Sequence, residues 1–153
     1  MKEREHKYLV CNDTWREREV SHIEITQGYL CRDPHTTVRV RLCGNDGFLT
    51  VKGITCGDTR DEFEYSIPYE DASEILKFCS GHVVRKIRHF VPFDGLMWEI
   101  DEFLGPHAPL YIAEVELPED MQSWPLPSFA GTDVTGDPRY YNSNLIDLKN
   151  GID

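Results

Sequence analysis

Apolar and polar residues alternate through most of the chain up to position 117, and this period of two is typical of β-strands with one apolar face. The first such run extends from Lys2 to Val10 and places Glu3, Glu5 and Lys7 on one face. Seven further strands are predicted at residues 21–30, 37–42, 48–53, 58–66, 84–91, 96–103 and 111–117. The alternation therefore predicts a set of eight antiparallel strands.

Turn signals and one amphipathic helix connect these strands. Residues 44–47 (G-N-D-G) and 94–95 (D-G) are typical of hairpin turns. Residues 71–79 repeat apolar side chains at helical spacing, and Gly81 follows to end the helix. Residues 119–135, rich in proline, glycine and tryptophan, predict an ordered wrapping loop with little regular structure. Asp137 and Pro138 then predict the start of a short helix over residues 139–146.

Charged side chains are sorted by sign from strand to strand. The polar faces of the first, fifth, seventh and eighth strands are acidic, and those of the third, fourth and sixth are basic. An open sheet with one face in water would also alternate, but a merely solvated face mixes both signs because neighbouring like charges repel. We therefore predict a mainly β (α+β) fold, a closed eight-stranded antiparallel tunnel with a charged interior. The helix at 71–79 and the C-terminal segment would cover its apolar outer faces.

A tunnel lined by both signs of charge suits a ligand that is itself highly charged. Arginine forks and lysine ammonium groups bind phosphoryl oxygens. Carboxylates bind hard divalent cations such as Mg²⁺ or Mn²⁺. The residue types therefore predict a metal-complexed polyphosphate as the ligand.

Composition limits the other classes of function. A chain of 153 residues fits one domain spanning positions 1–153. Its formal net charge of -11 argues against nucleic acid as a partner, because non-specific nucleic-acid binding needs a broad basic surface. The N-terminus has no apolar signal-peptide region, and no apolar run approaches the length of a membrane span, so no membrane partner is expected.

Cysteines and histidines show no ligand spacing. Five cysteines, an odd number without a C-x-x-C pair, predict reduced thiols in a cytoplasmic protein. The six histidines are scattered along the sequence, and we expect them to be surface or packing residues.

The motif Glu3-Arg4-Glu5-His6-Lys7 resembles the E-x-E-x-K signature of the triphosphate tunnel metalloenzymes, also called the CYTH superfamily. Further motifs similar to this family follow in order along nearly the whole chain: Gln27-Gly28-Tyr29-Leu30, Arg39-x-Arg41, Lys52-Gly53, Glu62-x-Glu64, Lys86-x-Arg88, Trp98-Glu99-x-Asp101 and Ala113-Glu114-Val115-Glu116-Leu117. The tail at residues 135–142 is similar to that of the short bacterial members. The resemblance implies an eight-stranded antiparallel tunnel that binds a triphosphate together with a divalent metal ion.

The resemblance also implies roles for the motif residues. The metal ion, Mg²⁺ or Mn²⁺, would be held by Glu3, Glu5, Asp101, Glu114 and Glu116. The phosphates would be bound by Arg39, Arg41, Lys52, Lys86 and Arg88. The catalytic candidates are Lys7, Tyr29 and Glu114. A second metal ion, or the orientation of the basic residues, would involve Glu62, Glu64 and Glu99; structural ion pairing accounts equally well for Glu62 and Glu64.

Members of this family hydrolyse inorganic tripolyphosphate, thiamine triphosphate or RNA 5′-triphosphate, and some are adenylate cyclases. This chain is short and has no obvious insertion for a nucleobase or thiazole pocket, so we expect a hydrolase of a small polyphosphate, tripolyphosphate first. Two alternatives stay open: a class IV type adenylate cyclase acting on ATP, and a non-catalytic module that binds polyphosphate or nucleotides. The sequence allows a homodimer and does not decide between the metal ions.

Overall fold

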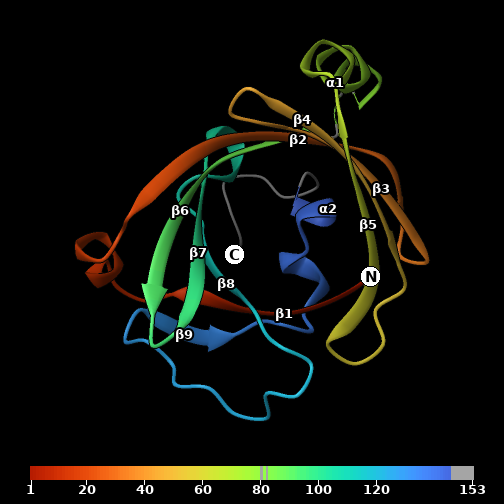
Figure 1. Ribbon diagram of the computed structural model, residues 1–153. Coiled ribbons are helices and arrows are strands. Elements are labelled where there is room, and N and C mark those ends of the chain that lie inside the picture. Colours follow the sequence, from red (N-terminus) through yellow and green to blue (C-terminus); the bar gives the residue numbers. More distant parts are fainter. Residues whose placement is uncertain (80, 82, 146–153) are drawn as a thin grey trace.

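The alternating segments form nine β-strands, eight of which close into a ring (Figure 1). The computed structural model describes residues 1–79, 81 and 83–145. The strands are β1 (Lys2–Val10), β2 (Ser21–Asp33), β3 (Thr36–Cys43), β4 (Asp46–Gly53), β5 (Thr59–Ile67), β6 (Val83–Phe93), β7 (Leu96–Phe103), β8 (Tyr111–Glu116) and β9 (Ala130–Asp133). Hydrogen-bonded neighbours follow the order β5-β4-β3-β2-β6-β7-β8-β1, and an antiparallel pairing of β5 with β1 closes the ring. The predicted eight-stranded antiparallel barrel is therefore confirmed.

Two strand predictions need correction. The strand predicted at 21–30 continues to Asp33, so Gly28 lies well within it. A Cβ atom on Gly28 would come within 2.6 Å of the Cβ of Cys79, so this glycine permits a close approach by the helical segment above it. The loop predicted at 119–135 contains β9, which pairs with the outer edge of β1.

The predicted helix at 71–79 is present as α1 (Tyr69–Leu76), and its last turn tightens into the 3₁₀ helix η2 (Lys77–Cys79). It packs over β3 and β4, where Val40 and Ala72 belong to one buried cluster. The remaining helical turns are short: η1 (Thr14–Glu17), η3 (Gly105–His107), η4 (Pro138–Tyr140) and α2 (Asn142–Leu145).

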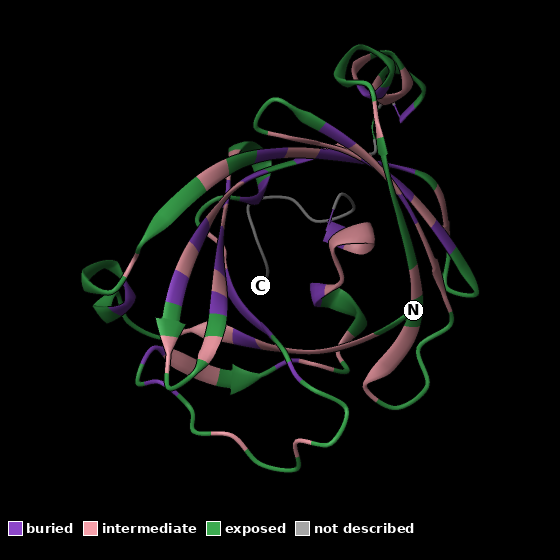
Figure 2. Ribbon diagram, viewed as in Figure 1, coloured by how far each residue is buried: buried purple, intermediate pink, exposed green. Residues whose placement is uncertain are grey.

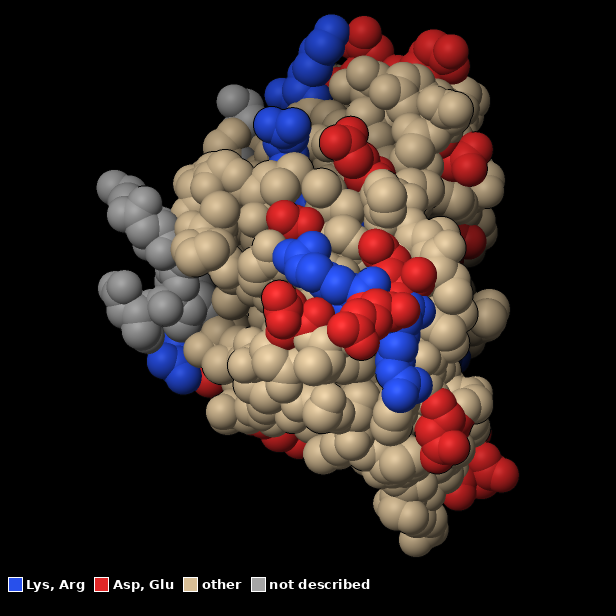
Figure 3. Space-filling view, turned by 90° about the vertical axis from the view of Figure 1, so that its left-hand side faces the viewer, with Lys and Arg blue, Asp and Glu red and all other residues tan. Residues whose placement is uncertain are grey.

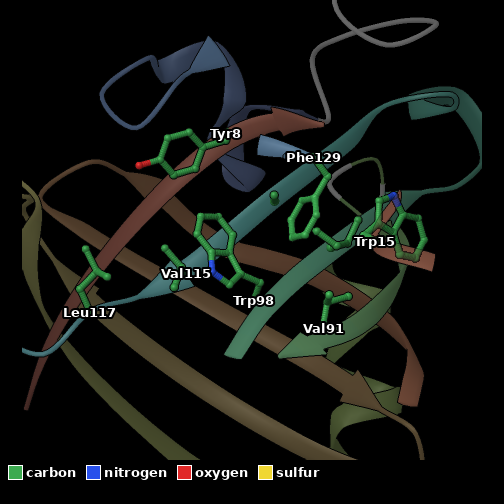
Figure 4. Close-up of a cluster of buried hydrophobic side chains, with 9 residues drawn as sticks. Tyr8, Trp15, Val91, Trp98, Val115, Leu117 and Phe129 are labelled. Atoms are coloured by element: carbon green, nitrogen blue, oxygen red, sulfur yellow. The ribbon is translucent and has the colours of Figure 1, made fainter. Parts of the chain in front are cut away.

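The main apolar core lies outside the barrel rather than within it (Figure 4). Buried positions recur along β6, β7 and β8 (Figure 2). The members of this core come from the outer faces of β1, β6, β7 and β8 and from the segments that wrap them: Tyr8, Trp15, Val91, Trp98, Ile100, Ala113, Val115, Leu117 and Phe129. Burial of each Val, Leu, Ile or Phe side chain contributes about 1.5–3 kcal/mol. The wrapping segment between β8 and β9 therefore stabilises the barrel from outside, as expected for a tunnel with a charged interior.

The last described segment differs from the prediction because it covers the inside of one barrel end. There the inward positions are apolar, and Val84, Phe103 and Ile112 cluster with Tyr140 and Leu145. Figure 1 shows α2 inside the ring of strands. An apolar lumen end needs an apolar partner, which η4 and α2 supply. The side chain of residue 137, the expected N-cap, accepts a hydrogen bond from the backbone N–H of residue 139 at 3.0 Å. Residue 146, where the predicted helix would end, lies outside the described residues.

The five cysteines are free thiols, as the sequence predicts. Among the described residues, none of the helices has the length and hydropathy needed to span a bilayer.

Candidate functional site

The barrel encloses a cavity of about 340 Å³ whose lining is largely charged. Seven of the chain's 16 lysines and arginines line it, together with eight of its 27 aspartates and glutamates. The predicted site residues in this lining are Glu3, Glu5, Lys7, Tyr29, Arg39, Arg41, Lys52, Glu62, Glu64, Lys86, Arg88, Glu99, Glu114 and Glu116. Asp101 is the predicted site residue that is absent from the lining.

A group of basic residues and a group of acidic residues face each other across the cavity. In the ring of eight, β3 and β8 lie four strands apart, as do β4 and β7, so these strands form opposite walls. We call the residues on β3 and β4 the basic wall: Arg39, Arg41 and Lys52. We call the residues on β1, β7 and β8 the acidic wall: Glu5, Glu99, Glu114 and Glu116.

Carboxylates of the acidic wall are paired with each other by strand register. Glu5 and Glu116 are partners across β1 and β8, and Glu99 and Glu114 are partners across β7 and β8. Like charges directly opposite each other on one sheet face repel. Burial raises the pKa of Glu114, with a further rise from Glu5, and burial likewise raises the pKa of Glu116. The acidic wall therefore favours the binding of a cation.

Lys7 lies among these carboxylates. Its Nζ is 3.9 Å from Oε1 of Glu5 and 3.8 Å from Oε1 of Glu114. Burial opposes the charge of Lys7, but Glu114 and Glu5 outweigh burial and raise its pKa. Both distances exceed a normal hydrogen bond, so Lys7 reduces the repulsion and leaves carboxylate oxygens free to bind a ligand.

On the basic wall, a chain of hydrogen bonds orients Arg41. Its Nε and Nη2 donate to Oε1 of Gln27 at 3.0 and 2.8 Å. Gln27 is fully buried, and its Nε2 donates to the hydroxyl of Tyr29 at 3.0 Å and to Oδ1 of Asn142 at 3.1 Å. Burial lowers the pKa of Arg41 to about 10, so the guanidinium stays charged at neutral pH.

The guanidinium group of Arg39 is only partly hydrogen-bonded in the described part of the chain. Its Nη2 donates to Oγ1 of Thr50 at 3.3 Å and lies 3.7 Å from Oε2 of Glu64. Its Nε is buried and has no hydrogen-bond partner in the described part of the chain. A buried guanidinium N–H without a partner is costly, and an anionic oxygen in the cavity would satisfy it.

Lys52 connects the strands that close the ring. Its Nζ donates to both carboxylate oxygens of Glu3, at 2.9 and 3.1 Å, and lies 3.2 Å from Oε2 of Glu62. Together with the contact between Arg39 and Glu64, this arrangement favours the ion-pairing role for Glu62 and Glu64.

Asp101 lies beneath the cavity surface, where Lys86 and Arg88 occupy both of its oxygens. The Nζ of Lys86 donates to Oδ2 at 2.7 Å, while Nε and Nη2 of Arg88 donate to Oδ1 and Oδ2 at 2.8 and 2.9 Å. Burial disfavours the carboxylate, but the two cations hold the pKa of Asp101 well below its usual range. This geometry favours a positioning role for Asp101 over the metal-binding role that the family resemblance implied.

Several cavity residues were missed by sequence reasoning. Arg60 lines the cavity from β5 and donates to the backbone carbonyl of Gly53 at 3.0 Å. Residues 60, 62 and 64 share one face of a strand, so the sequence could have placed Arg60 in the cavity with Glu62 and Glu64. Asn142, which accepts from Lys86 at 2.7 Å, had no such signal, because only the return of the tail into the barrel brings it there.

The donor set fits a hard divalent ion, since the acidic wall offers several carboxylate oxygens that Lys7 and Arg88 approach only at 3.5–3.9 Å. Its carboxylates do not form a tight three-ligand cluster. Among the described residues, the group of three His, Cys, Asp or Glu residues with ligand atoms all within 4.8 Å of one another lies elsewhere, at Glu19, His22 and His89.

Comparison with known proteins shows the family of this chain. The model of a family described as the CYTH domain matches residues 1–141. An inorganic triphosphatase of Acetivibrio thermocellus is 44% identical over 146 residues, covering 95% of this chain and 93% of the relative. An inorganic triphosphatase of Nitrosomonas europaea is 34% identical over 149 residues, covering 95% and 97%. A crystal structure of an inorganic triphosphatase is 31% identical, with a TM-score of 0.66 and coverage of 98% of this chain and 95% of that one.

Proposed function

The chain belongs to the CYTH domain family, and from this premise we propose that it is a hydrolase of inorganic tripolyphosphate that depends on a divalent metal ion. The observation that carries the proposal is the cavity in which a basic wall faces an acidic wall of register-paired carboxylates. The names of the two relatives, both inorganic triphosphatases that align over 95% of this chain, support the same substrate.

The basic wall and the β6 pair bind the phosphates in this proposal. Arg39 offers an Nε that has no hydrogen-bond partner among the described residues, and Arg41 is held in place by Gln27. Lys86 and Arg88, fixed by Asp101, add two cations on the neighbouring wall. Fixed donors lose little conformational entropy when they bind phosphoryl oxygens, which favours affinity.

The metal ion, Mg²⁺ or Mn²⁺, would be held by Glu3, Glu5, Glu114 and Glu116. When bound, it would neutralise charge on the triphosphate and lower the pKa of a water molecule. In hydrolysis, water attacks a terminal phosphorus, the bridging P–O bond breaks, and pyrophosphate leaves with phosphate as the other product.

Three residues are proposed to act on the reacting groups. Glu114 has a raised pKa, which suits a carboxylate that accepts a proton from the attacking water. Lys7 supplies positive charge beside Glu5 and Glu114, and Tyr29, whose hydroxyl is held by Gln27, faces the cavity near the basic wall.

We also propose the setting in which the protein works. Free thiols suit the reducing cytoplasm. A small polyphosphate is the proposed partner, and the net charge of -11 makes nucleic acid an unfavourable one. Residues 1–153 are proposed to act as one domain, with a homodimer as one form that the chain can take.

One assay tests the function. The protein is incubated separately with tripolyphosphate, ATP and thiamine triphosphate, each with Mg²⁺ or Mn²⁺, and phosphate, pyrophosphate and cyclic AMP are measured. Equal release of phosphate and pyrophosphate from tripolyphosphate, faster than from the other two substrates, supports the proposal. Cyclic AMP with pyrophosphate from ATP would identify a cyclase instead, and tight binding without any product would identify a binding module.

A further inference from the structure

A second group of ligand-type side chains lies on the outer wall of the barrel, away from the cavity. His22 and His89 are register partners on β2 and β6, so both point to the same sheet face. Because Arg88 lines the cavity, its neighbour His89 faces outward, where it packs against Trp15 with ring centroids 4.7 Å apart. Glu19 comes from the connection between η1 and β2 and reaches both histidines.

The atoms of this group converge on one point. Oε2 of Glu19 is in contact with Nδ1 of His89 and lies 3.7 Å from Nδ1 of His22. The two imidazole rings have centroids 5.7 Å apart. One ligand atom from each of the three side chains lies within 4.8 Å of the others. Two nitrogens and one carboxylate oxygen gathered this closely are ligand types that a divalent transition metal takes.

His89 is also supported as a metal-bound histidine usually is. Its second nitrogen, Nε2, is 2.9 Å from Oε1 of Glu102. The other oxygen of Glu102 accepts a hydrogen bond from the hydroxyl of Tyr111 at 3.2 Å. A carboxylate that holds the far nitrogen of a ligating imidazole fixes the ring orientation and raises its basicity. The imidazole is nearly buried, with 9% of its side chain exposed, so its position is set by packing as well.

We propose that Glu19, His22 and His89 form a transition-metal site on the outer wall, with Zn²⁺ as the ion that suits two imidazoles and one carboxylate. This site is separate from the proposed magnesium or manganese site in the cavity, which offers oxygen ligands. His22 is well exposed, so the site is open to solvent and leaves a position for water.

The site would fasten the η1 segment to the barrel wall. Glu19 belongs to the connection that follows η1, whereas His22 and His89 belong to adjacent strands. The face of the barrel that carries η1 and β6 bears acidic and basic side chains side by side (Figure 3). The charged side chains of this face therefore do not form a field of a single sign, and the proposed site depends on the geometry of its three ligands.

The test is a Zn²⁺ titration of the full chain against a chromophoric chelator, with excess Mg²⁺ present to occupy the cavity carboxylates. The parent should bind one Zn²⁺ that His22→Ala and Glu19→Gln lose. Glu102→Gln should weaken the same binding by about 10–100-fold, because it loosens the support of His89 without removing a ligand. Co²⁺ in place of Zn²⁺ should give a visible absorption band that His22→Ala abolishes.

Two controls separate this site from other Zn²⁺ binding. His35→Ala removes an exposed histidine that has one carboxylate neighbour, Asp33, and should keep the full stoichiometry. Glu116→Gln alters the cavity and should also keep it. Hydrolysis of tripolyphosphate should be the same in His22→Ala as in the parent. Equal Zn²⁺ binding in His22→Ala and the parent, or none in the parent, would overturn the proposal and leave an ion pair between His89 and its two carboxylates.

Discussion

At the scale of single residues, the main feature of the site is the repulsion between carboxylates that strand register places opposite each other. Glu5 and Glu116 face each other across two strands, and Glu99 and Glu114 do the same. Natural sheets avoid such pairs because they cost stability. Their presence on the wall opposite Arg39 and Arg41 is explained when a cation and an anion bind together between the walls.

Replacing Glu5 or Glu116 by glutamine tests this explanation. Each change keeps the side-chain shape and removes one anion, so kcat should fall by on the order of a hundredfold or more, about 2.7 kcal/mol of lost transition-state stabilisation. Steady-state phosphate release at several Mg²⁺ or Mn²⁺ concentrations measures the effect. Binding of tripolyphosphate without metal should survive or tighten.

Glu70→Gln, which changes an exposed carboxylate on α1, is the matched control. Full turnover in both cavity variants would remove the metal site from the mechanism.

Arg41→Ala tests the basic wall. The change removes a charge-assisted contact to a phosphoryl oxygen, so affinity for tripolyphosphate should fall by about 1.5–3 kcal/mol, measured by calorimetry. Arg85→Ala on β6 is a matched control, because Arg85 is exposed and lies outside the cavity lining. Equal affinity in Arg41→Ala and Arg85→Ala would show that phosphate binds elsewhere.

At the scale of elements, ion pairs hold the connection between β4 and β5 against β1. Oδ2 of Asp58 accepts from Nε of Arg4 and lies equally close to Nε2 of His6, both at 2.8 Å. These side chains point outward on β1, so Asp58 fastens the segment before β5 beside the seam where β5 closes the ring. Hydrogen bonds from Arg4 and His6 hold the pKa of Asp58 well below its usual range.

This shift predicts how stability depends on pH. The folded-state pKa of Asp58 is depressed, so its contribution is complete above the unfolded value of about 3.9 and is lost as pH falls toward the folded value. Asp58→Asn should lower Tm at pH 7, and the difference from the parent should shrink below about pH 4. Thermal unfolding of both proteins from pH 3 to 7 measures this. A difference that stays constant over the whole range would contradict the proposed ion pairs.

At the scale of the whole molecule, the barrel gathers charges of both signs, with a larger share of the chain's basic residues than of its acidic residues. The chain carries a net charge of -11, yet seven of its lysines and arginines line one cavity. The apolar core is outside the barrel, so the interior is free to bind a charged ligand without loss of packing. The apolar end formed with Tyr140 and Leu145 closes part of the lumen from within.

Ligand binding should therefore stabilise the closed ring. Tripolyphosphate with Mg²⁺ should raise Tm. At a hundredfold excess of ligand over Kd, the free energy of unfolding should increase by about 2.7 kcal/mol. Differential scanning fluorimetry with Mg²⁺ alone as the reference measures the shift, and the Arg41→Ala variant should show a smaller one. An unchanged melting curve at millimolar ligand and metal would argue against binding inside the barrel.

The sequence by itself determined the strands, their inward faces and the charge of each wall. These properties are local, because side chains at i and i+2 share a face whatever the strand pairs with. Glu5, Arg41 and Lys52 could thus be assigned to one interior before the structure was known. The role of Gly28 was not predictable, since that glycine is explained by the packing of Cys79 against it.

Only the tertiary structure decided which groups meet. The pairing of Glu5 with Glu116, the ion pairs that bury Asp101, and the return of Asn142 into the barrel all join residues far apart in the chain. The outer group at Glu19, His22 and His89 is the plainest case, because its histidines have no ligand spacing in sequence and become neighbours through the register of β2 and β6. Strand register is set by the closure of the whole ring, and no local pattern of residues contains it.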